Sequence, residues 1–325
     1  MKIAIVGAGW IGCHLAHKLK NNHKITIYDK EDIFSGSSSN NQNRLHLGFH
    51  YARNKTTRNM CKITFNKFIE DYKEVVSDVN NNIYSIPEKE SLLDFETYKS
   101  ILDHEKYDYE ICNVPELNNI EGSIKVKEKH IDHQKARSFF RNSIGNIFSI
   151  EKITEKLTNK FKQKYDIVIN CTNNMLLPYK NDFFYELCIM LKYKKLKKTS
   201  FDALTLVDGN LFSIFPYQEN TFTLSTVKHT PINSFKSTKE LNKENINQAQ
   251  VNQIINKMEK TTTQYYKNFK NDFKYEGYFI SVKSKIVSES SSRFPIIKKE
   301  DNLINCFSGK IQGIYHIEEF IKGLL

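Results

Sequence analysis

The sequence predicts an α/β protein in which a second domain, built on a mixed or antiparallel sheet, is inserted into a parallel-sheet domain. Three observations predict this class. A short apolar strand at 2–6 leads into a glycine-rich turn, a second short strand follows at 24–29, and two alternating strands flank a polar turn within 211–231. The length of 325 residues is sufficient for two interleaved domains.

The first element is the strand KIAIV at 2–6, which is short and β-branched, as a buried parallel strand usually is. The turn Gly7-Ala8-Gly9-Trp10-Ile11-Gly12 follows it. In this spacing Gly7 permits a tight turn, Gly9 lets the backbone approach a pyrophosphate, and Gly12 lets the next helix pack closely. The amides at the start of that helix would face the phosphates. The pattern indicates a Rossmann-like dinucleotide site.

The second strand, KITIYD at 24–29, completes a β-α-β unit and ends in Asp29, with Lys30 directly after it. A carboxylate about 20 residues after the glycines can accept hydrogen bonds from ribose hydroxyls. An acidic residue at this place favours an unphosphorylated adenosine ribose. The unit therefore predicts NAD or FAD in preference to NADP.

The next segment does not continue the strand and helix alternation that is usual in a nicotinamide enzyme. Residues 34–51 read FSGSSSNNQNRLHLGFHY, and such small polar residues let a chain run close along an extended cofactor. The following stretch, 55–72, predicts a helix with one apolar face formed by Cys61, Phe65, Phe68 and Tyr72.

Further elements follow in the second half of the chain. HIDHQKARSFFRNSI at 130–144 predicts a helix capped by Asp132, and YDIVINCTNN at 165–174 predicts a late parallel strand. The run KYKKLKK at 192–198 alternates lysine with apolar residues and predicts a solvated strand edge. The stretch 233–273 predicts an amphipathic helix that covers the sheet.

Several of these motifs resemble the D-amino-acid oxidase (DAO) family of FAD-dependent oxidoreductases. The glycine turn, the Gly-Ser-Ser stretch after the second strand, the segment from His130 and the strand at 165–174 all match it. RLHLGFHY at 44–51 is most similar to the 2-hydroxyglutarate oxidoreductases of that family. The C-terminal RFPIIKKEDNLINCFSGKIQGIYH also matches, with a glycine turn that opens the last helix. One departure is Asn-Cys-Thr-Asn at 170–173, where Asn replaces the family's usual Gly at a left-handed position.

The resemblance implies a Rossmann-like, discontinuous FAD-binding domain at 1–80, 125–180 and 285–325. It places the substrate domain at 81–124 and 181–284. Together with the glycine motif it predicts these contacts with FAD: Gly7, Gly9, Trp10, Ile11, Gly12, Asp29, Lys30, Ser37, Ser38, Asn43, Arg44, Leu45, Gly48, Cys171, Thr172, Gly309, Lys310, Ile311, Gln312 and Gly313.

The predicted catalytic residues are His46, His50 and Arg293. A neutral imidazole can accept a proton at physiological pH, and both histidines share a face with Gly48 if the segment is extended. An i, i+4 pair on a helix would share a face as well. The missing side chain of Gly48 is expected to leave room for the flavin ring. Arg293, Arg44 and Lys310 are alternative clamps for an anionic substrate, or partners for negative charge on reduced flavin.

Two further questions stay open at this point. A covalent flavin link at His46 is an alternative to non-covalent binding. Tyr51, Tyr217 and Tyr278 either line the pocket or pack in the core.

The composition restricts the remaining function classes. Six scattered cysteines without metal-ligand spacing predict neither disulfides nor a metal site, and they favour a reducing compartment. No apolar run is long enough to span a membrane and no signal sequence opens the chain, so a soluble cytoplasmic protein is expected. The net charge of +11 is spread along the chain, which favours an anionic small-molecule substrate over nucleic acid. The oligomeric state is left undetermined.

The sequence therefore predicts an FAD-dependent oxidoreductase that oxidises a CH–OH or CH–NH group of an anionic small molecule. One alternative is a flavin-dependent mutase, or another sugar-modifying enzyme, that acts on nucleotide sugars. A second alternative is an RNA-binding or tRNA-modifying flavoprotein, for which the positive charge is the supporting observation.

Overall fold

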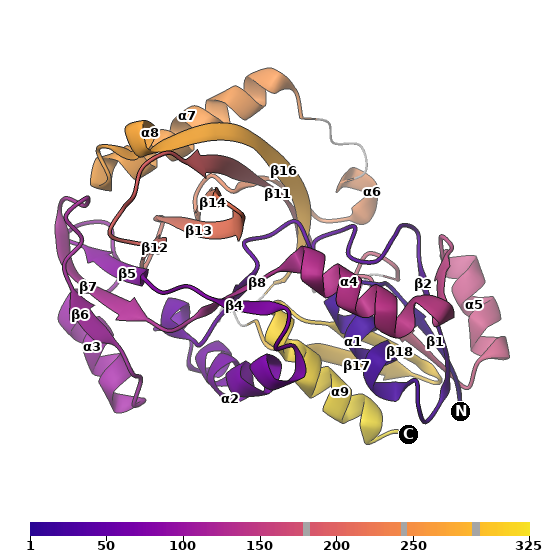
Figure 1. Ribbon diagram of the computed structural model, residues 1–325. Coiled ribbons are helices and arrows are strands. Elements are labelled where there is room, and N and C mark those ends of the chain that lie inside the picture. The colour runs from indigo at the N-terminus through magenta and orange to yellow at the C-terminus, as the bar shows by residue number, and fades with distance from the viewer. Residues whose placement is uncertain (178–182, 242–245, 288–292) are drawn as a thin grey trace.

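The computed structural model, which describes residues 1–177, 183–241, 246–287 and 293–325, contains two large sheets and a small one (Figure 1). Among the described residues, six strands form the first sheet in the order β17-β18-β10-β1-β2-β9. All neighbours in it run parallel except β17 and β18. Its strands are β1 (Lys2–Val6), β2 (Lys24–Asp29), β9 (Phe148–Ile150), β10 (Ile167–Asn170), β17 (Ile296–Glu300) and β18 (Leu303–Phe307).

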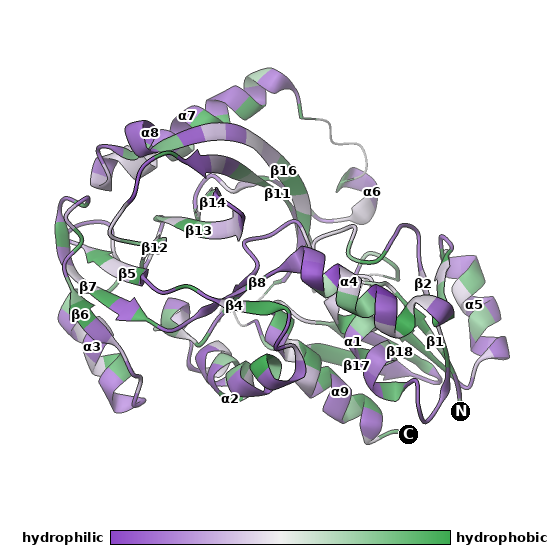
Figure 2. Cartoon of the chain, viewed as in Figure 1, coloured by the Kyte–Doolittle hydropathy of each residue, from purple (hydrophilic) through white to green (hydrophobic). Residues whose placement is uncertain are grey.

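Helices cover both faces of this sheet. The helix α1 (Trp10–Leu19) packs beside α4 (His133–Ile144) and α9 (Ile314–Lys322), and α5 (Glu155–Lys164) packs against β10. Figure 2 shows hydrophobic and hydrophilic residues alternating around α4 and α9, as expected of helices with one buried face. The parallel order with covering helices confirms the Rossmann-like prediction.

The second sheet is mixed, because β5 and β12 pair in parallel while its other neighbours are antiparallel. The long strands β11 (Phe183–Lys195) and β16 (Phe273–Ile286) curve beneath α7 (Gln248–Tyr265) (Figure 1). In the described part of the chain its strands are β5 (Asn82–Pro87), β6 (Glu110–Cys112), β7 (Ile120–Val126), β11 (Phe183–Lys195), β12 (Ala203–Leu206), β13 (Phe212–Gln218), β14 (Thr221–Thr226), β15 (Pro231–Phe235) and β16 (Phe273–Ile286). This sheet confirms the predicted fold class.

Among the residues that the structure describes, a small three-stranded sheet lies between the two large sheets (Figure 1). It has the order β3 (Arg44–Leu45), β8 (Lys129–Ile131) and β4 (Val76–Asp78). The short 3₁₀ turn η1 (Phe49–Tyr51) and the helix α2 (Lys55–Asp71) follow β3, and α3 (Phe95–His104) lies farther along. The four residues predicted for the apolar face, at positions 61, 65, 68 and 72, are all buried, which confirms that face.

Two local predictions are confirmed by backbone geometry. Asp132 caps α4, because its carboxylate accepts the amide of Gln134 at 2.9 Å. Asn173 has a φ of 55°, so it occupies the left-handed conformation predicted for it from the sequence.

The prediction of one helix across 233–273 is wrong in its bounds. The helix α7 is limited to Gln248–Tyr265 and begins at a capping box between Asn247 and Gln250. Residues 233–235 belong to β15, because they pair with β11, and the short helices α6 (Thr238–Leu241) and α8 (Phe269–Asp272) flank α7. Residues 242–245 of the predicted range lie outside the described residues. The predicted role is confirmed, because the apolar face of α7 packs in a core cluster with strands of the mixed sheet.

The prediction of a strand edge at 192–198 is also wrong. Tyr193 of β11 is buried and pairs with Phe222 of β14 on one side and with Tyr275 of β16 on the other. The ammonium group of Lys195 has partners beside the strand, because its Nζ lies 5.3 Å from the centre of the Phe222 ring and donates to the carbonyl of Phe201 at 3.0 Å. Alternating lysines can therefore belong to an interior strand.

The predicted division into domains stays a proposal, and its boundary at 180/181 lies outside the described residues. None of the helices within the described ranges is long and apolar enough to cross a membrane.

Candidate active site

The glycine-rich turn between β1 and α1 has no space for side chains. Gly7 has a φ of +106°, and a Cβ on it would lie 2.6 Å from the carbonyl oxygen of Cys171. A Cβ on Gly12 would collide with the carbonyl oxygen of Gly7, and one on Gly9 would lie 2.7 Å from Ser38 Oγ. The turn is therefore a tightly packed cradle, of the kind that brings backbone amides close to a pyrophosphate.

The helix α1 begins at this cradle with Trp10. Its backbone amide donates to Ser38 Oγ at 3.1 Å, and its ring is 6% exposed. The ring packs 4.9 Å from Phe34 and 5.3 Å from Phe68. Ile11, next to it, packs against the same core cluster. Aromatic packing thus fixes the start of α1 beside the glycine-rich cradle.

Asp29 lies at the carboxyl end of β2 and is partly exposed. Its Oδ2 accepts the amide of Ala8 at 2.6 Å, and its Oδ1 accepts only a long contact of 3.3 Å from the amide of Glu31. Asp29 therefore braces the glycine turn and retains acceptor capacity for ribose hydroxyls. Lys30 is exposed and lies 3.6 Å from Glu31.

The serine- and asparagine-rich segment is anchored to two other elements. Ser37 Oγ donates to the carbonyl of Val282 on β16 at 2.8 Å, and the carbonyl of Asn43 accepts the amide of Ile131 at 2.7 Å. Leu45 is fully buried in the core, so its side chain serves packing. Thr172 donates through Oγ1 to Asn170 Oδ1 at 2.7 Å, at the end of β10.

The structure brings together the histidines that the sequence singled out. The rings of His46 and His50 are 5.7 Å apart, and the ring of Tyr51 lies 5.4 Å from His46 and 5.1 Å from His50. Lys310 Nζ lies 4.8 Å from the centre of the Tyr51 ring. Arg293 donates its amide to Thr57 Oγ1 at 3.1 Å. We call His46, His50, Tyr51, Lys310 and Arg293 the histidine cluster.

The C-terminal turn joins this cluster through Gln312. Its Nε2 donates to the carbonyls of His46 at 2.7 Å and Cys61 at 2.9 Å, while its buried Oε1 has no hydrogen-bond partner among the described residues. A Cβ on Gly309 would lie 3.0 Å from Arg293 Cδ, and one on Gly313 would collide with the side chain of Ser308. Ile311 packs against the core of the parallel-sheet domain. The turn therefore has close backbone packing, which lets main-chain atoms approach a ligand, and one buried acceptor without a donor. Both features fit a bound flavin, whose ring carries an N–H donor.

Burial and neighbouring cations set the charge of the cluster. Burial, with the charge of Lys310, lowers the pKa of His46 to about 4 despite the opposing effect of Glu128. Burial, His46 and Lys310 together hold the pKa of His50 well below its usual value. Burial, with the charges of Arg293 and Lys283, lowers the pKa of Lys310 to about 7 against the opposing effects of Cys61 and Glu128. At neutral pH both imidazoles are thus uncharged.

The guanidinium of Arg44, which the sequence suggested as a clamp for an anion, makes contacts within the protein. It is buried, donates to Tyr84 OH and to Ser213 Oγ, both at 2.8 Å, and stacks 4.0 Å from the Phe215 ring. It also lies 3.9 Å from Glu128 Oε2. Its Nη1 and Nη2 are therefore engaged within the protein, while Nε has no hydrogen-bond partner among the described residues.

The sequence reasoning missed Glu128, Tyr84 and Ser213. Glu128 stands in the basic run KVKEKH, which is typical of a solvated loop, and Tyr84 and Ser213 stand in ordinary strands. Nothing in the local pattern indicated that these three side chains meet around Arg44.

The expectation for Gly48 is corrected. Its φ is +130°, and a Cβ would collide with Tyr107 OH and lie 2.9 Å from Arg58 Cγ. The space beside Gly48 is filled by protein and does not admit a ring. The residue is glycine because its backbone conformation and these two neighbours exclude a side chain.

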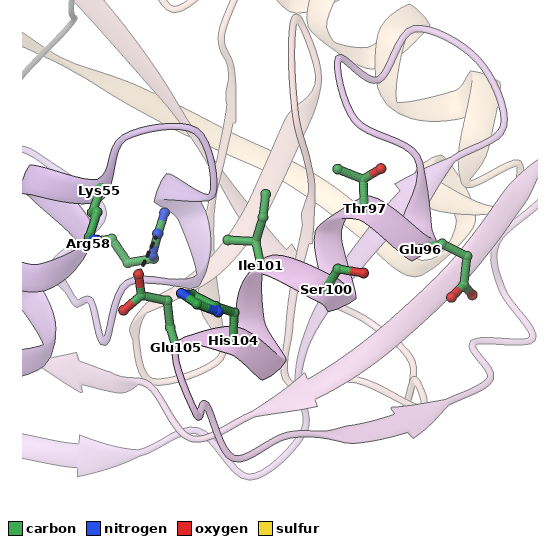
Figure 3. A pocket seen from close by; sticks show the side chains of 8 residues that line it. All are labelled: Lys55, Arg58, Glu96, Thr97, Ser100, Ile101, His104 and Glu105. Carbon is green, nitrogen blue, oxygen red and sulfur yellow. Dashed lines mark hydrogen bonds and ion pairs between the residues drawn. The ribbon is translucent and has the colours of Figure 1, made fainter.

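Two surface grooves lie outside the histidine cluster. The first runs between α2 and α3 (Figure 3) and is lined by Lys55, Arg58, Glu96, Thr97, Ser100, Ile101, His104 and Glu105. Arg58 closes its inner end by donating to Glu105 at 3.2 Å and to the carbonyl of Tyr51 at 3.0 Å. The second is lined by His130, Asp132, Gln134, Pro216, Tyr217, Gln218 and Glu219. Tyr217 stacks on His133 and Phe279, and Tyr278 is 36% exposed.

Known proteins resemble this chain over its whole length. A family model described as "FAD dependent oxidoreductase" (DAO) matches residues 2–99. The FAD-dependent monooxygenase FPY4 of Fusarium mangiferae is 30% identical, covering 99% of this chain and 90% of the relative. The FAD-dependent monooxygenase kojA of Aspergillus flavus is 27% identical, covering 100% of this chain and 86% of the relative.

Solved structures share the fold at low identity. Glycine oxidase from Geobacillus kaustophilus superposes with a TM-score of 0.72 at 12% identity, covering 99% of this chain and 93% of that one. L-alpha-glycerophosphate oxidase from Mycoplasma pneumoniae with FAD bound superposes with a TM-score of 0.71 at 12% identity, covering 98% of this chain and 92% of that one. The family-model match, the similarity to FPY4 and the cradle at Gly7–Gly12 all indicate the same protein family. The chain belongs to the DAO family of FAD-dependent oxidoreductases, and FAD is its cofactor.

Proposed function

We propose that this enzyme oxidises a CH–OH or CH–NH group of an anionic small molecule at the histidine cluster. The observation that carries the proposal is the meeting of two neutral imidazoles with Tyr51 and Lys310, next to the C-terminal turn at which Arg293 borders Gly309. Cations of this kind hold a carboxylate or phosphate, and a neutral imidazole accepts a proton. When bound, FAD supplies the acceptor for the two electrons that leave the substrate.

The chain's own residues divide the remaining work. Arg293 and Lys310 bind the anionic end of the substrate, and His46 or His50 accepts the proton of its hydroxyl or amine. Arg44 donates to Tyr84 and Ser213, so this proposal assigns it to the wall of the site and leaves the clamp to Arg293 and Lys310. Orientation by such groups accelerates reaction because the substrate is held in the reactive geometry before proton transfer.

The decisive experiment is reduction of bound FAD by substrates in the absence of oxygen. Bleaching of the flavin spectrum by a 2-hydroxy acid or an amino acid is the expected result, with little bleaching by the corresponding neutral alcohol or amine. Equal bleaching by charged and neutral members of a pair would contradict the anionic clamp. The resemblance of 44–51 to 2-hydroxyglutarate oxidoreductases makes 2-hydroxyglutarate the first acid to test.

A second candidate is oxygen insertion, favoured by the name of the relatives FPY4 and kojA, which are FAD-dependent monooxygenases. In that case flavin would be reduced by a separate donor such as a reduced nicotinamide, and the organic product would contain an oxygen atom from O₂. Labelling with isotopic oxygen distinguishes the two, because a dehydrogenated product contains none of the label.

A further inference from the structure

Glu128 is a buried carboxylate without an assigned role, between β7 and β8, and it is 1% exposed. Its Oε1 accepts the amide of Leu47 at 2.8 Å and that of Gly48 at 3.4 Å. Its Oε2 accepts the hydroxyl of Tyr84 at 2.7 Å, and Arg44 Nη1 lies 3.9 Å from that oxygen. A buried carboxylate with this many donors is held in one position.

The same carboxylate lies against His46. Glu128 Oε1 is 3.5 Å from His46 Nδ1, which is an electrostatic contact, since Nδ1 makes no hydrogen bond within the described ranges. Burial alone would raise the pKa of Glu128, but His46, Arg44 and the Tyr84 hydroxyl lower it to about 2. Because His46 itself is neutral at physiological pH, the groups that keep Glu128 an anion there are the nearby Arg44 guanidinium, the Tyr84 hydroxyl and the backbone amides of Leu47 and Gly48.

The other groups around His46 carry different charges. Lys310 and Arg44 are the cations whose fields oppose protonation of the ring, and the rings of His50 and Tyr51 pack against it. Glu128 is the anion whose effect on His46 is opposite in sign. A neutral imidazole beside an anion is most stable with its proton on the nearer nitrogen.

We infer that Glu128 is the positioning residue of His46: it keeps the proton of the neutral ring on Nδ1 and leaves the Nε2 lone pair as the proton acceptor. This rests on the proposed function, in which His46 accepts the substrate's proton. Because Oε1 also holds the amides of Leu47 and Gly48, one carboxylate fixes both the ring and the backbone that carries it. A proton arriving at Nε2 would give an imidazolium cation beside Glu128, and the carboxylate would stabilise it.

The first test reads the tautomer directly, without activity. Nitrogen NMR of histidine-labelled protein distinguishes a protonated from an unprotonated ring nitrogen, and loss of signals in His46→Gln assigns the residue. The wild-type ring is expected to be neutral with Nδ1 protonated. A wild-type ring protonated on Nε2 overturns the inference whatever the variants do.

The second test uses a matched pair of variants in holoenzyme. Glu128→Gln keeps the size of the side chain and removes its charge, so the preference for Nδ1 should weaken and flavin reduction at saturating substrate should slow about 10- to 100-fold. KM should change little, because Glu128 does not touch substrate. Tyr84→Phe removes one hydrogen bond to the same carboxylate but leaves its charge, so it should keep the wild-type tautomer.

The outcomes separate this inference from the proposed function. If no substrate reduces flavin while the tautomer depends on Glu128, the function is wrong and the positioning role survives. If Glu128→Gln and Tyr84→Phe shift tautomer and rate equally, Glu128 acts only through packing and the inference fails.

Discussion

Lys310 changes its charge close to physiological pH, because burial and the neighbouring cations bring its pKa to about 7. Below that pH the side chain is an ammonium ion that attracts an anion, and above it the side chain is neutral. We therefore expect KM for a fully ionised carboxylate substrate to rise as the pH increases through about 7. Measurement of KM between acid and alkaline pH checks this, and a flat profile would be inconsistent with it.

Two variants of Lys310 separate charge from shape. Lys310→Arg keeps a cation at all accessible pH values, so the rise of KM with pH should largely disappear. Lys310→Met should raise KM about 10- to 100-fold at acid pH, the scale for losing one charge-assisted contact, and should leave it almost independent of pH.

His46 and His50 are the residues proposed to accept the proton. Replacement of the responsible one by alanine should slow substrate-driven flavin reduction roughly 10²- to 10⁴-fold, the range for losing a general base, with FAD still bound. Rapid mixing without oxygen measures the rate. His104→Ala, at an exposed position on α3, is the matched control. Wild-type rates in both variants would assign the two histidines to packing.

At the scale of single elements, the glycine turn offers the sharpest contrast. Gly12→Ala places a Cβ against the carbonyl of Gly7, whereas a Cβ on Gly145 meets nothing within 4 Å. Gly12→Ala should therefore cost about 1–3 kcal/mol, the usual scale for overpacking, and should lower FAD content. Gly145→Ala should match wild type in thermal unfolding and in the ratio of flavin to protein absorbance. Equal FAD content in the two variants would count against the cradle.

The elements also show what a sequence can and cannot predict. The unit formed by β1, α1 and β2 was predictable because its pattern is local: the glycines, the helix and Asp29 lie within 30 residues. The strand at 192–195 was misjudged because alternation reveals which side chains face water but not which strands lie on either side. The reason for Gly48 was misjudged because a glycine required by its neighbours looks the same in sequence as one that faces a ligand.

At the scale of the whole molecule, Arg44 links the small sheet to the large mixed sheet. It lies on β3, and its partners Tyr84 and Ser213 lie on β5 and β13. No local pattern could predict this contact, because its members are separated by up to 169 positions. The histidine cluster was predictable in part, since His46 and His50 are near neighbours in sequence, but its buried anion was not.

Removal of this link should destabilise the fold. Arg44→Met leaves Glu128 without its cationic neighbour, so the free energy of unfolding should fall by about 3–5 kcal/mol, the scale for breaking a buried pair. Urea unfolding measures it. The double variant Arg44→Met with Glu128→Gln should recover part of the loss, since neither charge is then left alone. Strictly additive losses would mean that the two side chains do not interact.

The single tryptophan of the chain gives the fold a built-in optical reporter. Trp10 is fixed among aromatic rings at the first residue of α1, beside the glycine turn that is predicted to bind the cofactor. Tryptophan emission overlaps flavin absorption, so excited Trp10 would transfer its energy to a nearby flavin and its own emission would be quenched. Because each chain has one tryptophan as energy donor and binds one flavin as acceptor, the remaining tryptophan emission would give the fraction of molecules without cofactor. Loading of wild-type protein and of every variant above could thus be followed in solution without a label.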